Sequence, residues 1–153
     1  MSLNLVRKFR YNFRTFLWSL IRMFLFLTST TNSLLMVQRR SRLRVVDNSP
    51  LGKQAMLEGK PPRMIHVCYS RMRHGFLGDK VLVTIKGQMK HAIIVGTVQE
   101  QRAFTPRYDS NNIVLLDEQG NPLGTRILTP IPNRLRGKGQ EMSKLIAIGT
   151  KFV

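Results

Sequence analysis

Short apolar runs bounded by turn-forming residues recur through most of the chain. Residues 41–48 alternate polar and apolar side chains before a turn sequence that ends in proline, which is typical of a half-buried strand. Residues 64–69 are rich in strand-forming side chains, and residues 54–57 are compatible with the start of another strand. Because turn residues interrupt these runs roughly every ten residues, the pattern indicates a small all-β barrel or sandwich.

Two neighbouring runs of strand-forming residues predict an antiparallel hairpin. Residues 80–86 and 90–98 consist mainly of strand formers, and Gly87-Gln88 between them suits a tight turn. Residues 142–148 suit a short helix, although they could also form a final strand. Helix is therefore expected only near the C terminus.

A second hairpin is predicted within residues 112–136. Residues 113–116 form an apolar run too short for a helix, which indicates a buried strand. The polar turn of residues 117–122 then leads into a return strand at residues 123–128. Gly124 in this return strand leaves room for the close approach of a partner strand or a ligand.

Three arginines are expected at the exit of this hairpin. Asn133 is placed to cap a short segment after the prolines that follow the return strand. The hairpin would then carry Arg126, Arg134 and Arg136 on one support. Such an arrangement suits phosphate binding better than catalysis.

The N-terminal region has a different pattern. On a helical wheel the apolar residues between Phe9 and Leu27 share one face, no acid occurs, and a hydroxyl-rich run follows. This composition is typical of a mitochondrial targeting peptide, so we expect residues 1–40 to be that peptide and residues 41–153 to form the domain. Two alternatives stay open: residues 16–27 as the core of a secretory signal, or a retained basic arm that runs along RNA.

The charge of the chain restricts its partners. The 153 residues include 25 Lys and Arg against 8 Asp and Glu, a net charge of +17 at pH 7. From Val45 onward 16 basic residues still face 8 acidic ones, so the domain is basic without its leader. Nucleic acid is the first candidate partner and an anionic membrane surface the second. The single cysteine, Cys68, allows no internal disulfide and suits a reducing compartment.

Metal and catalytic motifs are weak or missing in the sequence. His66 and Cys68 lie two apart on a predicted strand and could share a metal, but a structural zinc site needs four ligands and only His74 and His91 remain. A buried thiol beside an ordinary imidazole is therefore preferred. Neither a phosphate-binding P-loop nor a nucleophile-elbow serine occurs, and carboxylates are scarce. We expect no enzymatic activity, no cofactor and no small-molecule substrate.

The basic residues at strand ends and turns are the remaining constellation. With few acids nearby they form an electrostatic footprint that suits the backbone and shape of folded RNA. Few aromatic residues accompany them, so base stacking is less strongly indicated. The candidate RNA-binding residues are Lys53, Arg71, Arg73, Lys86, Lys90, Arg102, Arg107, Arg126, Arg134, Arg136 and Lys138.

Four sequence blocks resemble the family of universal ribosomal protein fourteen of the large subunit, in its mitochondrial form. They are residues 43–49 (LRVVDNS), Gly78-Asp79, residues 92–95 (AIIV) and residues 122–127 (PLGTRI). The resemblance covers about residues 42–153, and the first and last blocks are specific. It implies a mainly β fold: a small five-stranded β-barrel with a short C-terminal helical part, preceded by the targeting segment.

The resemblance also implies partners. Members of the family bind large-subunit rRNA, touch large-subunit ribosomal protein nineteen, reach small-subunit rRNA through an inter-subunit bridge and offer a surface to the ribosome-silencing factor. By motif position, the family's basic residues correspond to Lys53, Arg71, Arg73, Lys90, Arg126, Arg134 and Arg136. Residues 96–101 are nearly uncharged where relatives carry a basic run, so this ribbon is expected to contact RNA less heavily than in bacterial relatives.

These observations lead to one interpretation with two rivals. The chain is interpreted as a structural, rRNA-binding constituent of the large subunit of the mitochondrial ribosome, located in the matrix. One rival is a free-standing small-barrel nucleic-acid-binding protein. The other is an organellar protein anchored in a membrane through residues 16–27.

Overall fold

The computed structural model describes residues 36–69, 74–98 and 107–153, which belong to one compact unit that begins at Met36. The predictions for the leader, including the membrane-anchor alternative at residues 16–27, lie outside the described residues. In the part of the chain that is described, no helix combines the length and apolar character needed to cross a bilayer.

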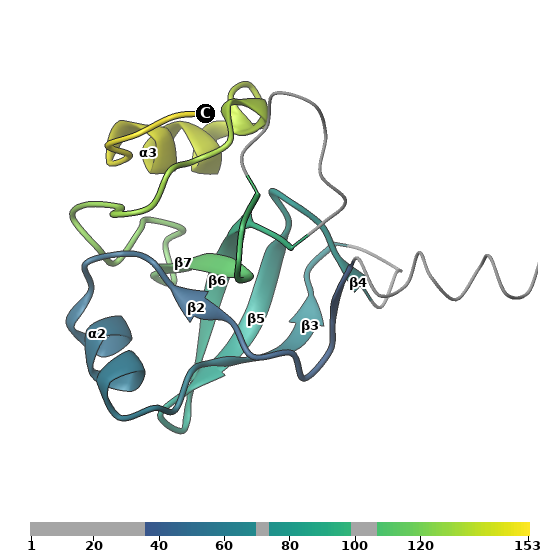
Figure 1. The fold of residues 1–153 in the computed structure, drawn as a ribbon, viewed down its shortest axis with the longest axis vertical. Helices are drawn as coiled ribbons and strands as arrows, with labels where there is room; N and C mark the ends of the chain where they lie inside the picture. Colours follow the sequence, from purple (N-terminus) through teal and green to yellow (C-terminus); the bar gives the residue numbers. More distant parts are fainter. Residues whose placement is uncertain (1–35, 70–73, 99–106) are drawn as a thin grey trace, which may run out of the picture. The chain divides into compact units, whose positions relative to one another are not determined.

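Five strands form the main sheet, in the order β2-β7-β6-β5-β3 (Figure 1). All neighbours in this sheet are antiparallel except β2 and β7, which are parallel. Two further strands, β1 and β4, pair antiparallel with each other. The strands are β1 (Val37–Gln38), β2 (Arg44–Val45), β3 (Arg63–Val67), β4 (His74–Gly75), β5 (Lys80–Ile85), β6 (Gln88–Gly96) and β7 (Asn112–Leu116).

The predicted hairpin of residues 80–98 is confirmed, although its turn is Lys86-Gly87 and Gln88 already belongs to β6. β5 and β6 pair from Lys80 opposite Ile93 to Ile85 opposite Gln88. The turn residues Lys86 and Gly87 both have positive φ, 48° and 79°, which matches the twist of a tight hairpin. The strands predicted at residues 64–69 and 113–116 are confirmed as β3 and β7.

β7 and the second half of β6, from residue 92 onward, are apolar on both faces because each face packs into a different core. The first core lies against one face and includes alternate residues of both strands, such as Ala92, Ile94, Ile113 and Leu115. The second core takes the residues between them. Its members are Val46, Ile93, Val95, Val114, Leu116, Ile127, Ile131, Leu135, Met142 and Leu145. A continuous apolar run is the sequence pattern that a strand buried on both faces requires.

The helix α2 (Pro50–Leu57) corrects one prediction, because residues 54–57 are helical and not the start of a strand. The side chain of Ser49 accepts a hydrogen bond from the Gly52 N–H at 3.2 Å, and Pro50 occupies the first helical turn. Ser-Pro is therefore a helix start here, because the serine supplies the cap and the proline ring already has a helical φ. Gly52 and Ala55 face the first core.

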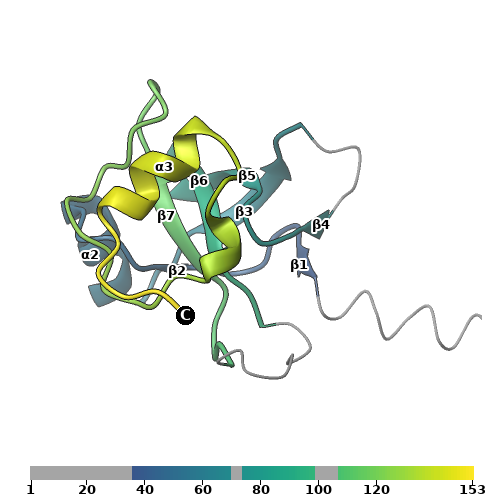
Figure 2. The same ribbon diagram turned by 90° about the horizontal axis from the view of Figure 1, so that it is seen from above.

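The C-terminal segment is helical as predicted. α3 (Gln140–Ala147) buries Met142 and Leu145 in the second core. Figure 2 shows α3 lying over β6 and β7, and Figure 1 shows α3 and α2 well apart. The strand alternative for residues 142–148 is wrong.

The predicted return strand at residues 123–128 is also wrong. Leu123 donates one backbone hydrogen bond to Leu115, but the chain then leaves β7. Ile127 bridges to Asp47 and to Gly149 instead. The cause is close packing at Gly124, where an added Cβ would lie 2.7 Å from the Asp47 Cβ and 2.9 Å from the Asn48 nitrogen. The close approach predicted for Gly124 is thus confirmed, with residues 47–48 as the partner.

A short 3₁₀ helix, η1 (Asn133–Leu135), follows. Pro132, and not Asn133, occupies its cap position, and the Asn133 backbone carbonyl accepts the Arg136 N–H at 3.1 Å. The prediction that Asn133 caps this segment is therefore wrong, because the preceding proline already sets the extended cap conformation.

β2 and β3 are the outer strands of the main sheet. The residues just before β2 nevertheless contact the start of β3: Arg42 bridges to Arg63, and the Leu43 N–H donates to the Pro62 carbonyl at 2.9 Å. A mainly β fold with five paired strands is confirmed, whereas closure into a barrel stays a prediction.

Candidate nucleic-acid interface

The described residues carry a large excess of positive charge. They include 17 Lys and Arg against 7 Asp and Glu, a net of +10. Within the described ranges only two ion pairs form, Lys80–Glu141 and Lys86–Glu58, each at 2.7 Å. Most of the cations therefore have no acidic partner in the part of the fold that is described.

Residues 40–43, before β2, contact residues 62–64 at the start of β3, and we call this contact the strand seam. Two cations lie opposite each other in it. Arg42 and Arg63 are exposed partners in an antiparallel bridge. Like charges directly opposite on paired strands destabilise the pairing, so an anion between them would relieve repulsion. Arg44 lies two residues beyond Arg42 on extended backbone, which puts it on the same face.

Arg42, Arg44 and Arg63 are not among the predicted site residues. The exposure of Arg42 and Arg44 could have been predicted, because polar and apolar residues alternate in residues 42–45 and so direct these two side chains away from the core. The opposition of Arg42 and Arg63 depends on pairing between distant segments, which local sequence does not reveal.

Four of the predicted residues follow one another along the C-terminal segment. Arg126, Arg134, Arg136 and Lys138 are all exposed. The Arg136 guanidinium carbon lies 4.7 Å from the centre of the Phe152 ring, which holds the side chain by a cation–π contact. The Lys138 Nζ donates to the Leu77 carbonyl at 3.3 Å.

The other predicted residues lie apart from that segment. Lys53 is exposed on α2, Arg107 is exposed before β7, and Lys90 is partly buried on β6. Lys86 is engaged by Glu58, whose pKa is lowered mainly by the hydrogen bond from Lys86. Its charge is thus already compensated, which makes it a weaker candidate. Arg71, Arg73 and Arg102 lie outside the described residues.

A groove of about 430 Å³ lies between α2 and the segment at Leu128. Arg44 and Lys53 line it together with two exposed leucines, Leu57 and Leu128. Asp47 also lines this groove, although only 4% of the residue is exposed.

The Asp47 carboxylate is an unusual buried acid. Desolvation by burial raises its pKa from 3.8 to about 6, against the opposing effect of the nearby Ser49 hydroxyl and backbone groups. Those groups lie close, but neither carboxylate oxygen makes a hydrogen bond of good geometry within the described residues. The carboxylate is packed between Gly52 and Gly124.

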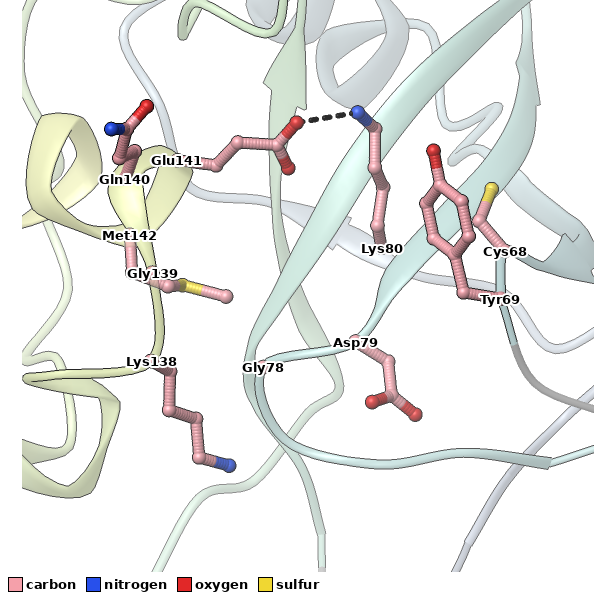
Figure 3. A pocket seen from close by; sticks show the side chains of 10 residues that line it. All are labelled: Cys68, Tyr69, Gly78, Asp79, Lys80, Lys138, Gly139, Gln140, Glu141 and Met142. Carbon is pink, nitrogen blue, oxygen red and sulfur yellow. Dashed lines mark hydrogen bonds and ion pairs between the residues drawn. The ribbon is translucent and has the colours of Figure 1, made fainter.

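A second groove, of about 410 Å³, lies between the start of β5 and the start of α3 (Figure 3). The ion pair of Lys80 with Glu141 spans it, and the hydrogen bond from Lys80 to Glu141 raises the Lys80 pKa. The Asp79 carboxylate accepts the Phe76 N–H at 2.8 Å. Tyr69 and Lys138 complete the walls.

The weak metal hypothesis finds no support in the geometry. Cys68 Sγ lies 3.9 Å from His91 Nδ1, whereas His66 Nδ1 contacts the Arg39 guanidinium at 3.2 Å. The two expected ligands therefore have different neighbours. Among the described residues, no three His, Cys, Asp or Glu side chains gather as a metal site would require.

Comparison with known proteins extends over most of the chain. The family described as ribosomal protein L14p/L23e matches residues 36–153. The chain is 48% identical over 125 residues to "Large ribosomal subunit protein uL14m" of Danio rerio, covering 82% of this chain and 86% of that protein. It is 38% identical over 131 residues to "Large ribosomal subunit protein uL14" of Aquifex aeolicus, covering 77% of this chain and 100% of that protein. The corresponding protein of Aquifex pyrophilus is 37% identical over the same length.

Proposed function

Because this chain belongs to the ribosomal protein L14p/L23e family, which is structural and not enzymatic, we propose that it is a structural constituent of the mitochondrial large ribosomal subunit that binds large-subunit rRNA. The resemblance drawn from the sequence blocks is confirmed by the family match. The mitochondrial assignment follows from the identity to uL14m of Danio rerio and implies a location in the matrix.

The observation that carries rRNA binding is the uncompensated positive charge of the fold. The described residues carry a net charge of +10 and form only two ion pairs, and Arg42 lies opposite Arg63. The negative charge that balances this surface must therefore come from a bound partner. Phosphates replace the mobile anions of such a surface, and the entropy of counterion release stabilises the complex. The contacts position the protein on its RNA without reading bases.

The residues proposed to contact phosphate are the described cations of the predicted set other than Lys86, together with Arg42, Arg44 and Arg63. Arg126, Arg134 and Arg136 are central to the proposal because they lie on one segment held against the second core by Ile127, Ile131 and Leu135. The proposed set is Arg42, Arg44, Lys53, Arg63, Lys90, Arg107, Arg126, Arg134, Arg136 and Lys138; Lys86, Arg71, Arg73 and Arg102 remain candidates from the sequence.

We also propose that the main sheet closes into the small barrel expected from the family. The hydrogen bonds between residues 40–43 and 62–64 support this proposal, since they join the edge before β2 to β3. Hydrogen exchange tests it: the amides of Leu43 and Met64 should be as slow to exchange as those of β6. Fast exchange at both positions would indicate an open edge.

For the leader, we propose that the segment preceding the folded unit is the targeting peptide. Val37 is 1% exposed in the first core and β1 pairs with β4, so a cut before Met36 would leave these contacts intact. A cut after residue 40, as the predicted boundary implies, would remove them. Sequencing the N terminus of the mature protein decides between these, and an intact Met1 would eliminate cleavage.

The individual partners of the protein are inferred from the family alone. We propose contacts with large-subunit ribosomal protein nineteen, with small-subunit rRNA at an inter-subunit bridge, and with the ribosome-silencing factor. Cross-linking of isolated mitochondrial ribosomes and large subunits, followed by mass spectrometry, tests each contact separately. A partner that yields no cross-link in either particle would be removed from this set.

Incorporation of a triple variant tests the rRNA-binding proposal. Replacing Arg126, Arg134 and Arg136 with alanine should leave the fold intact, because all three side chains are exposed, but should reduce the fraction of protein that sediments with the large subunit. With isolated protein and large-subunit rRNA, the slope of log affinity against log salt should fall by about 0.7–0.9 for each phosphate that the variant no longer neutralises.

The matched control removes three other exposed cations, Lys60, Lys144 and Lys151. Both variants lose the same charge, so an equal loss of binding in both would indicate a diffuse field and would contradict the assignment to the C-terminal arginines. Normal sedimentation and an unchanged salt slope in the arginine variant would contradict it as well. If the unaltered protein itself sediments away from the large subunit, the proposed function fails.

A further inference from the structure

Tyr69 is an exposed aromatic side chain in a strained backbone position. It lies two residues beyond the end of β3, its φ is 61°, and 97% of the residue is exposed. A bulky L-residue in the left-handed region carries a conformational strain that glycine would not. The ring gains almost no burial in return, so the described fold offers nothing that offsets this strain.

The surroundings of Tyr69 are polar and cationic. Its ring stands beside the Lys80 side chain at the edge of the second groove, and Lys138 lies on the opposite wall (Figure 3). The two acids of this groove are already engaged: Glu141 pairs with Lys80, and Asp79 accepts the Phe76 N–H. Besides the Asp79 carboxylate, which keeps its charge, the groove presents to a ligand one aromatic face and the Lys138 ammonium group, which also donates to the Leu77 carbonyl.

We propose that Tyr69 is a stacking platform for an unpaired base of the bound rRNA, with Lys138 contacting the adjoining phosphate backbone. The inference rests on the proposed rRNA binding and adds to it a contact with a base. Aromatic faces stack on any base, and proteins that hold single-stranded segments combine such a face with nearby cations. Stacking would supply the burial that the exposed ring lacks.

An apolar protein partner fits this position less well. The strongly exposed leucines, Leu57 and Leu128, line the other groove and not the one at Tyr69. A single ring bordered by ammonium groups presents little area for protein contact. A nucleotide, in contrast, covers the ring with its base and carries on its phosphate the negative charge that Lys138 requires.

Two variants separate stacking from folding. Tyr69→Gly removes the ring and also relieves the strained φ, so its melting temperature should be no lower than that of the unaltered protein. Tyr69→Phe keeps the aromatic face and loses only the hydroxyl. Affinity for large-subunit rRNA should fall roughly tenfold in the glycine variant and stay near normal in the phenylalanine variant.

Chemical probing supplies the readout that a purely structural role would not change. Each variant replaces the endogenous chain in cells, and large subunits are isolated on a gradient. Their rRNA is then treated with dimethyl sulfate and with a reagent that acylates flexible 2′-hydroxyl groups. Protection of one unpaired nucleotide should disappear with Tyr69→Gly and persist with Tyr69→Phe.

Identical probing profiles for the two variants, or changes confined to paired nucleotides, would overturn the stacking proposal. These outcomes are distinct from failure of the proposed function, because they are measured on subunits that already contain the protein. Absence of the unaltered chain from the large subunit would instead overturn the function and, with it, this inference.

Discussion

Replacing Asp47 with asparagine is expected to stabilise the protein at neutral pH. Asp47 is 4% exposed, and neither carboxylate oxygen has a hydrogen-bond partner of good geometry in the described structure. Asparagine has nearly the same shape and no charge, so the substitution removes the buried charge while it leaves the packing against Gly52 and Gly124 unchanged.

The magnitude follows from the pKa of Asp47, which is raised from 3.8 in the unfolded chain to about 6 in the folded protein. Since the folded state holds the proton more tightly, the unaltered protein loses stability as pH rises from about 4 to about 6, and the loss is complete above that range. A shift of about two units corresponds to about 3 kcal/mol, or a difference in melting temperature of roughly 10 °C.

Thermal unfolding followed by circular dichroism between pH 3.5 and pH 8 measures this effect. The Asp47→Asn variant should nearly match the unaltered protein near pH 3.5, where Asp47 is protonated in the folded state and mostly protonated in the unfolded chain, and should exceed it increasingly up to pH 6–7. Asp109→Asn is the matched control, because it removes an exposed acid and should not reproduce the pH-dependent gain. Equal or lower stability of Asp47→Asn at pH 7 would refute the reasoning and would imply that the carboxylate has a partner that the described residues do not include.

Two further substitutions test the packing around the same region. Ser49→Ala removes the cap of α2 and should lower the free energy of unfolding by about 1 kcal/mol in urea titration. Ser49→Thr keeps the hydroxyl and adds no charge beside Asp47, so it should retain more of the stability; equal destabilisation by both would argue against capping. Gly124→Ala places a Cβ 2.7 Å from the Asp47 Cβ and should lower the free energy of unfolding by about 1–3 kcal/mol through overpacking. Gly87→Ala meets no atom within 4 Å, so it tests only the effect of a methyl group at a turn residue with positive φ. An unchanged stability of Gly124→Ala would show that the segments at residues 47–48 and 124 separate readily.

Local sequence was sufficient for elements that are defined by their own residues. β5 and β6 could be predicted because two runs of strand formers flank a turn that accepts positive φ. β7 was equally clear as a short apolar run between polar turns. The cationic character of the candidate site was also readable, since it depends on composition and not on pairing.

The errors arose where distant segments decide the structure. Residues 123–128 have the composition of a strand, but Gly124 lets the chain pack against residues 47–48, and Ile127 then bridges to segments on either side. α2 was missed because Ser49-Pro50 serves equally as a turn sequence and as a helix start, and only the burial of Ala55 in the first core selects the helix. The position of Arg42 opposite Arg63 could not be predicted either, because it depends on pairing between segments far apart in the sequence.

The surroundings of Asp47 indicate that the nearby basic residues do not serve to stabilise the fold. Arg44 and Lys53 line the same groove as this buried carboxylate, yet neither forms an ion pair with it within the described residues. A cation placed to stabilise the fold would be expected to relieve that desolvated charge first, because a buried acid gains the most from a partner. Arg44 and Lys53 instead remain exposed, at a cost in repulsion that the isolated protein does not recover. Their counter-charge must therefore be external, which is the condition that a phosphate backbone satisfies. Asp47→Asn should accordingly leave rRNA affinity unchanged while it stabilises the free protein, whereas Arg44→Ala and Lys53→Ala should weaken rRNA binding without loss of stability.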